Sequence, residues 1–302
     1  MLRVVAVANA KGGTAKTTTT VALAAEAAHR GFRTLVVDLD VQANATEQLI
    51  HGEGDGGKAL YRTMLDGDPL LVLQSTTENL DVATAGRRTQ DLADALARLV
   101  REAAPEELGA AYVEMRRTLH EACSGYDFVF VDTPPSEQSV TLLDFVYAAA
   151  THVILPTKID QNSTAAVSNA LKQLVRLSKR GAEVGDPIGI ALVDVDTSAS
   201  RLVEGALEDV RHIGGVVEPF ETLVSHRSGP VAYARAERMT PRQFADAAAV
   251  AHKRRFQALR ERNAEANPPW SEPSARRYVE DYSNLFSELV ERINSGGAAN
   301  GG

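Results

Sequence analysis

The chain has a single cysteine, no long apolar run and no excess of basic residues. Among its 302 residues there is a single cysteine, Cys123, which excludes a disulfide framework within one chain and any multi-cysteine metal or iron–sulfur site. No apolar run approaches the length needed to span a bilayer, and the N-terminus has no signal-peptide profile. The net charge of −8 argues against a uniformly basic nucleic-acid binder, although it leaves local basic patches open. These absences fit a protein of the reducing cytoplasm.

The composition is that of a chain with a substantial core. With 44% hydrophobic residues, 302 residues can form one large α/β domain or two small ones. We expect one doubly wound domain over residues 1–293, with a mostly parallel sheet, helices on both faces, and a ligand at the carboxyl ends of the strands. Residues 240–293 are expected to be a divergent helical region whose final helix covers 275–293. The Gly/Ala/Asn-rich residues 294–302 are expected to be a disordered tail.

The most informative stretch lies close to the N-terminus. Apolar residues of strand type at positions 4–8 lead into a glycine-containing loop and then into a stretch of helical propensity. In such a unit the loop N–H groups and the positive end of the helix dipole point at a phosphate. Lys16 would reach the β- and γ-phosphates, and the Thr17 hydroxyl would take one position on a magnesium ion. The predicted nucleotide-binding residues are Lys11, Gly12, Gly13, Thr14, Ala15, Lys16, Thr17 and Thr18.

This loop departs from the ordinary phosphate-loop pattern G-x-x-x-x-G-K-[ST] at both glycines. Ala10 and Ala15 stand where the pattern has glycine. If position 15 needs a positive φ, alanine there costs about 1 kcal/mol. That cost would loosen the loop without abolishing nucleotide binding. From this stretch alone, a turn that binds nothing is the alternative, and the motifs that follow weaken it.

Two further strands are predicted to end in acids. The apolar residues 34–37 end in Asp38 and Asp40, and residues 128–131 end in Asp132, followed by Thr-Pro-Pro. Carboxylates at the carboxyl ends of parallel strands lie where α/β sheets bind ligands. One acid of the first pair would position an attacking water, unless it only caps the following turn, and Asp132 would hold magnesium through water. Each motif alone is common, but their order along the chain favours a phosphate-loop nucleoside triphosphatase.

Together these residues resemble the ParA-type partition ATPases, in the family with a deviant phosphate loop that also contains MinD and the nitrogenase iron protein. The resemblance covers roughly residues 1–240. It depends on three motifs, at residues 11–18, 38–46 and 132–136, and continues through 153–157 and 189–193. It implies an ATPase that converts ATP and water to ADP and phosphate with magnesium as cofactor.

The resemblance also implies roles for single residues. Lys11 matches the signature lysine that reaches across an ATP-sandwich dimer to the partner's phosphates, while Lys16 and Thr17 match the phosphate and magnesium ligands. Asp40 matches the acid that orients the hydrolytic water and is a possible magnesium contact. Asp132 matches the acid that holds magnesium through water. The expected catalytic residues are therefore Lys11, Lys16 and Asp40.

The same resemblance implies a set of partners. It implies a homodimer with ATP that binds duplex DNA non-specifically and releases it after hydrolysis stimulated by a ParB-like centromere-binding protein. Exposed arginines in two loops of the family bind the DNA backbone, and Arg201 and Arg227 are the candidates here. For each, a solvated surface charge or a helix-end salt bridge is the other interpretation. The basic residues at 253–262 are a reserve candidate. A cytoplasmic, nucleoid-associated protein is expected.

The main alternative is a MinD-like or protein-cargo-positioning ATPase. A MinD-like protein needs a terminal basic amphipathic helix with bulky apolar residues. The final predicted helix instead carries Glu280, Asp281, Glu288 and Glu291, so no stable membrane anchoring is expected. A metal-cluster reductase is nearly excluded by the single cysteine, and the retained lysines and acids argue against a scaffold without turnover. A relative that spaces a protein cargo over the nucleoid would have the same sequence features.

Overall fold

The computed structural model describes residues 2–135, 139–215, 217–226, 228–260 and 272–299. Their centre is a seven-stranded sheet with the order β3-β4-β2-β5-β1-β6-β7. Only the short edge strand β3 is antiparallel, to β4. The strands are β1 (Arg3–Val7), β2 (Thr34–Asp38), β3 (Leu73–Gln74), β4 (Leu80–Ala83), β5 (Phe128–Asp132), β6 (His152–Thr157) and β7 (Asp186–Leu192).

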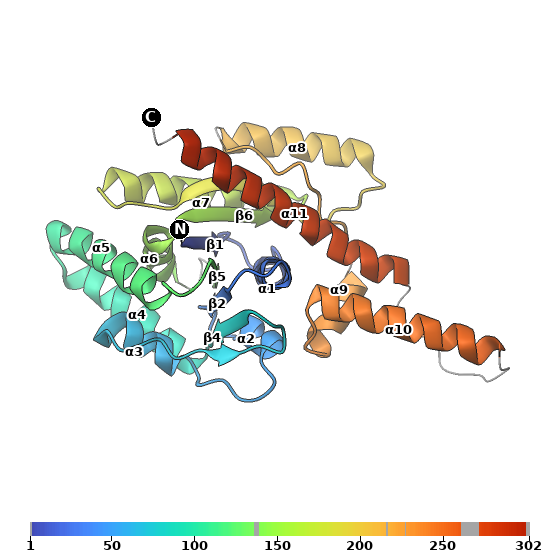
Figure 1. Ribbon diagram of the computed structural model, residues 1–302. Helices are drawn as coiled ribbons and strands as arrows, with labels where there is room; N and C mark the ends of the chain where they lie inside the picture. The colour runs from blue at the N-terminus through green and yellow to red at the C-terminus, as the bar shows by residue number, and fades with distance from the viewer. Residues whose placement is uncertain (1, 136–138, 216, 227, 261–271, 300–302) are drawn as a thin grey trace.

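Helices cover both faces of this sheet (Figure 1). On one face lie α1, α2 and the C-terminal helices α9, α10 and α11, and α3 to α8 cover the other. The expected doubly wound α/β fold is therefore confirmed. The helices are α1 (Lys16–His29), α2 (Asn44–Leu49), α3 (Lys58–Asp66), α4 (Arg87–Glu102), α5 (Pro105–Ala122), α6 (Val140–Ala149), α7 (Gln161–Lys179), α8 (Ser200–Gly214), α9 (Ser228–Ala236), α10 (Pro241–Arg260) and α11 (Glu272–Ala299).

The central strands are buried on both faces, which explains their nearly continuous apolar sequences. Along β1, Val4 and Ala6 belong to the core on the α3–α8 side, and Val5 and Val7 belong to the core beneath α1 and α11. The alternation follows from the two-residue period of a strand. None of the described helices has the length and hydropathy needed to cross a bilayer.

The register of the sheet brings the sequence motifs to one edge. Val7, at the end of β1, pairs with Asp132, which in turn pairs with Asp38 at the end of β2. The loops that follow these three strands therefore start at the same level of the sheet. In an open α/β sheet this edge is where ligands bind.

Helix α11 closes the α1 face of the sheet (Figure 1). Its Phe286 is fully buried and lies 5.4 Å from the Phe128 ring, centroid to centroid. The Arg30 guanidinium, at the end of α1, donates to the Ser283 carbonyl oxygen at 2.8 Å. We expected the final helix to end at residue 293, but α11 continues to Ala299, so positions 294–299 are helical rather than part of a disordered tail. The last three residues lie outside the described residues.

Candidate functional site

The loop after β1 has two residues in left-handed backbone conformations. Gly13 has φ 74°, and Ala15, directly before the first residue of α1, has φ 60°. Position 15 therefore has the positive φ that was considered for it from the sequence, and its alanine carries a strain of about 1 kcal/mol. This conformation turns the chain so that α1 starts at Lys16 with its N-terminus at the loop.

Lys16 is the buried cation of the loop. The residue is only 6% exposed, and its Nζ donates to the carbonyl oxygen of Lys11 at 3.0 Å. Burial lowers the pKa of Lys16, while the carboxylates of Asp132 and Asp40 oppose this shift. Burial has removed most of the water around the Lys16 ammonium, and the hydrogen bond to the Lys11 carbonyl replaces only part of it. The ammonium therefore has a strong preference for an anionic ligand.

Asp38 and Asp132 are both fully buried, but their environments differ. Asp38 accepts hydrogen bonds from the Thr46 N–H at 2.9 Å and the Thr46 hydroxyl at 2.8 Å, so it fastens α2 to the end of β2. Asp132 accepts from the Thr20 hydroxyl at 3.2 Å through Oδ1, and its buried Oδ2 has no partner of good geometry in the described chain. Burial raises the pKa of both carboxyls. Asp38 is therefore structural, and Asp132 retains an oxygen for a ligand.

The unpartnered oxygen of Asp132 fits the magnesium that the phosphate-loop class implies. Burial and the neighbouring Asp38 raise the pKa of Asp132, and the nearby Thr17 hydroxyl opposes them. A hydroxyl and a carboxylate are the hard oxygen donors that Mg²⁺ prefers. Within the described ranges no group of three or more His, Cys, Asp and Glu could hold a metal by itself. Such a sparse donor set suits Mg²⁺ that arrives with substrate phosphates and keeps several waters.

Asp40 occupies a different place from Asp38. Its backbone N–H donates to Asp38 Oδ1 at 3.1 Å, and its own Oδ1 accepts from the Gln42 N–H at 3.0 Å. The residue is 8% exposed and lines a cavity that also reaches Lys16. Of the two acids at the carboxyl end of β2, Asp40 is therefore the one presented to a ligand.

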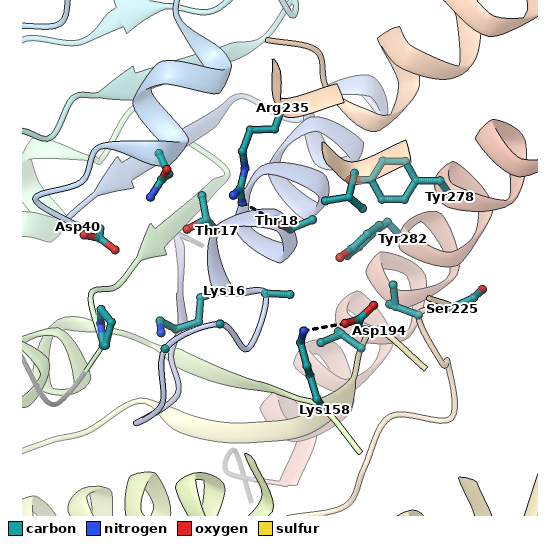
Figure 2. Close-up of a pocket in the computed structure, with 18 residues that line it drawn as sticks. Lys16, Thr17, Thr18, Asp40, Lys158, Asp194, Ser225, Arg235, Tyr278 and Tyr282 are labelled. Atoms are coloured by element: carbon teal, nitrogen blue, oxygen red, sulfur yellow. Dashed lines mark hydrogen bonds and ion pairs between the residues drawn. The ribbon is translucent and has the colours of Figure 1, made fainter. Parts of the chain in front are cut away.

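The cavity has a volume of about 390 Å³, within the range of small-molecule sites. One end is formed by the phosphate-loop residues and Asp40, and the other by side chains far along the chain (Figure 2). At that far end Lys158 Nζ pairs with Asp194 at 2.7 Å, and the Tyr278 and Tyr282 rings meet edge to face at 5.7 Å. The lining residues are Gly12, Gly13, Ala15, Lys16, Thr17, Thr18, Asp40, Asn44, Pro135, Lys158, Val193, Asp194, Val224, Ser225, Val231, Arg235, Tyr278 and Tyr282.

Some residues predicted from the sequence lie outside this cavity wall. Thr14 is buried, and its hydroxyl donates to the Lys11 carbonyl oxygen at 3.2 Å. Lys11 points away, with Nζ 3.2 Å from Asp160 Oδ1 and 3.3 Å from the Ser163 hydroxyl. Arg201 is exposed in the first turn of α8. The other DNA-binding candidate, Arg227, lies outside the described residues.

The sequence motifs did not reveal the far wall of the cavity. Tyr278 and Tyr282 come from α11, Arg235 from α9, and Lys158 and Asp194 from the ends of β6 and β7. None belongs to a short pattern around the phosphate loop. The only local signal for Lys158 and Asp194 is that each follows a predicted parallel strand, which places it at the ligand-binding edge.

Comparisons with known proteins agree with this architecture. The AAA_31 family, described as an AAA domain, matches residues 2–184. The Soj protein of Bacillus subtilis, described as a sporulation initiation inhibitor, is 34% identical over 182 residues, which are 60% of this chain and 67% of Soj. The chromosome-partitioning protein ParA of Myxococcus xanthus is 30% identical over 211 residues, covering 69% of this chain and 70% of that protein.

Solved structures share the fold at low sequence identity. The structure of pNOB8 ParA has a TM-score of 0.69 at 16% identity and covers 98% of this chain and 100% of that chain. Cyanothece McdA, solved as an ATP complex, has a TM-score of 0.66 at 19% identity, with 79% of this chain and 88% of that chain covered. Family match and relatives together define the class: the chain belongs to the AAA_31 family, among the ParA-type partition ATPases.

Proposed function

We propose that this protein is a DNA-segregation ATPase that hydrolyses ATP in the cavity between the phosphate loop and α11. The observation that carries the proposal is the convergence of a buried lysine, a cavity-lining acid and an unpartnered buried carboxylate oxygen at one sheet edge: Lys16, Asp40 and Asp132. Phosphoryl transfer needs positioning and charge neutralisation more than covalent chemistry, and these groups can supply both.

Each residue has a distinct part in the proposed reaction. Lys16 neutralises the β- and γ-phosphates, and Asp40 orients the attacking water. Thr17 and Asp132 would hold magnesium, directly and through water, and the ion would supply charge neutralisation at the phosphates. The distant wall, with Tyr278 and Tyr282, excludes water from the nucleoside end. In the proposed cycle, a ParB-like protein stimulates hydrolysis, and the protein acts on the nucleoid in the cytoplasm.

The position of the Lys11 side chain is best explained by a role across a dimer interface. Its side chain is 37% exposed, lies outside the cavity wall, and is tied to Asp160 at the start of α7. An exposed ion pair of this kind contributes little stability, so it can be exchanged readily for a better anion. The triphosphate of a second subunit is such an anion. The Lys11–Asp160 pair then describes the resting position of the lysine.

Lys11→Gln should therefore bind ATP but remain monomeric, whereas the wild type dimerises with ATP. The lost ammonium would leave the partner's phosphates without a counter-charge across the interface. Light scattering coupled to size exclusion, with ATP and with ADP, measures this directly. Asp160→Asn is the matched control, because it removes the resting partner and leaves Lys11 intact, and it should still dimerise. An ATP-dependent dimer of Lys11→Gln would contradict the assignment.

The proposal includes sequence-independent DNA binding by the ATP-bound dimer. A chain of net charge −8 can hold a polyanion only where cations gather locally, and pairing two subunits doubles such a patch. Arg201 is the described candidate, since it is exposed in the first turn of α8. Contacts to phosphates position a protein on DNA without reading bases, so unrelated duplexes should bind alike.

Arg201→Ala should weaken binding to every duplex while leaving ATP binding intact. Removing one phosphate-binding cation should lower the slope of log affinity against log salt by about 1. Biosensor titrations at several salt concentrations, with ATP, ADP or no nucleotide, test this, and Arg98→Ala on α4 provides an exposed-arginine control. Absence of ATP-dependent DNA binding by the wild type at low salt would overturn the segregation function. A protein-cargo-positioning ATPase would then be the function to test.

A further inference from the structure

Helix α9 brings one arginine, Arg235, to the nucleotide cavity from a part of the chain that no motif marks. The backbone around it is well fixed. Ala234 is fully buried, and its carbonyl oxygen accepts from the Met239 N–H at 2.7 Å. The Met239 carbonyl oxygen accepts in turn from the Gln48 side chain at 2.8 Å, which connects the end of α9 to α2. The Arg235 side chain therefore extends from a backbone that these hydrogen bonds hold in place.

The guanidinium of Arg235 points at the first turn of α1. Its Nη2 lies 3.4 Å from the Thr18 hydroxyl, and the side chain lines the cavity (Figure 2). In the described part of the chain no carboxylate lies within ion-pair distance of it. Arg242 on α10 is different, because its guanidinium is paired with Glu26 at 3.1 Å. Arg235 thus brings a positive charge that has no ion-pair partner among the described residues to a cavity that also contains Lys16.

The position of this charge indicates which part of a nucleotide it would meet. Lys16, Thr17 and Thr18 are the first three residues of α1, whose free N–H groups favour an anion. Figure 2 shows Thr17 between Asp40 and Arg235. Asp40 marks the γ-phosphate end, so the guanidinium lies toward the nucleoside. A planar guanidinium can donate two parallel hydrogen bonds to phosphate oxygens, which makes arginine well suited to this place.

We propose that Arg235 is a nucleotide-binding residue that contacts the α- and β-phosphates. The inference rests on the proposed nucleotide site and adds to it a cation from outside the phosphate loop. Because ADP and ATP share these two phosphates, Arg235 stabilises both complexes. It differs in this from Lys11, whose proposed role needs ATP and a second subunit.

The test is calorimetric titration of the full chain with ADP in the presence of Mg²⁺. Arg235→Ala should bind ADP about tenfold more weakly than the wild type, as expected when a charge-assisted hydrogen bond is removed. Arg235→Lys, which keeps the charge but not the planar fork, should recover part of the affinity. The affinity of Arg235→Ala should also fall less steeply with salt than that of the wild type. Arg238→Ala, in the exposed turn after α9, is the matched control and should bind like the wild type.

Arg235→Gln separates charge from shape, because it keeps most of the side-chain volume and should bind as weakly as Arg235→Ala. Wild-type ADP affinity in Arg235→Ala, or in a folded Arg235→Gln, would overturn the inference and leave the proposed site standing. Failure of the wild type itself to bind ADP or ATP would instead overturn the proposed function, and this inference with it.

Discussion

Asp40→Ala should bind ATP as the wild type does and hydrolyse it at least about 100-fold more slowly, because a positioned acid typically contributes a factor of that order or more. The carboxylate lines the cavity near Lys16, and the following Gln42 N–H holds it in place. Its proposed task is to orient water, so its removal should leave intact the groups that retain the nucleotide. Phosphate release and equilibrium ATP binding, measured on the same preparation, separate the two effects.

Asp40→Asn is the control for the shape of this loop. The amide oxygen can still accept from the Gln42 N–H, so the backbone should be preserved while the charge is removed. We expect Asp40→Asn to bind ATP and to turn over as slowly as Asp40→Ala. Near-normal turnover in Asp40→Ala would remove this residue from the catalytic role, whereas loss of ATP binding would give it a structural role like that of Asp38.

Phe286→Ala should lower the free energy of unfolding by about 3–5 kcal/mol, the usual cost of truncating a buried phenylalanine to alanine. Phe286 belongs to α11, and its ring is fully buried between the sheet and α1. Its centroid lies 5.4 Å from that of Phe128 and 6.3 Å from that of Phe32, and the Arg30 guanidinium lies 4.9 Å from it. Urea unfolding followed by circular dichroism measures the effect.

Glu291→Ala on the exposed face of the same helix is the matched control and should change the free energy of unfolding by less than about 0.5 kcal/mol. Because α11 also provides Tyr278 and Tyr282 of the cavity wall, Phe286→Ala should weaken nucleotide binding as well. Equal stability of the two variants would show that α11 is not part of the cooperative core.

The phosphate-loop half of the site is predictable because its chemistry is local in sequence. Strand, loop and helix follow one another around Lys16 and Thr17, and the turn between them needs few residues. Even the positive φ at Ala15 follows from comparison with the glycine of the usual pattern. Asp40 and Asp132 are predictable for a related reason, since the ends of parallel strands meet at one edge.

The other half of the site depends on packing between distant segments. Tyr278 and Tyr282 reach the cavity because α11 packs against α1, and Arg235 reaches it from α9, which packs against α10 and α11. Ordinary amphipathic periodicity does not specify which helix a face will meet. The same reason explains why the Lys11–Asp160 pair was not foreseen, since the two residues are 149 positions apart. That residues 240–293 form a divergent helical region stays a prediction. In the structure, α11 from this region contributes directly to the core.

The most direct test of the central claim is the rate of phosphate release from ATP and Mg²⁺ by the purified wild-type chain, measured beside Asp40→Ala with and without duplex DNA. The proposed function predicts a rate that needs Mg²⁺, is present in the wild type and is reduced at least about 100-fold in Asp40→Ala. Absence of turnover by the wild type under all of these conditions, or equal rates in the two proteins, would contradict it.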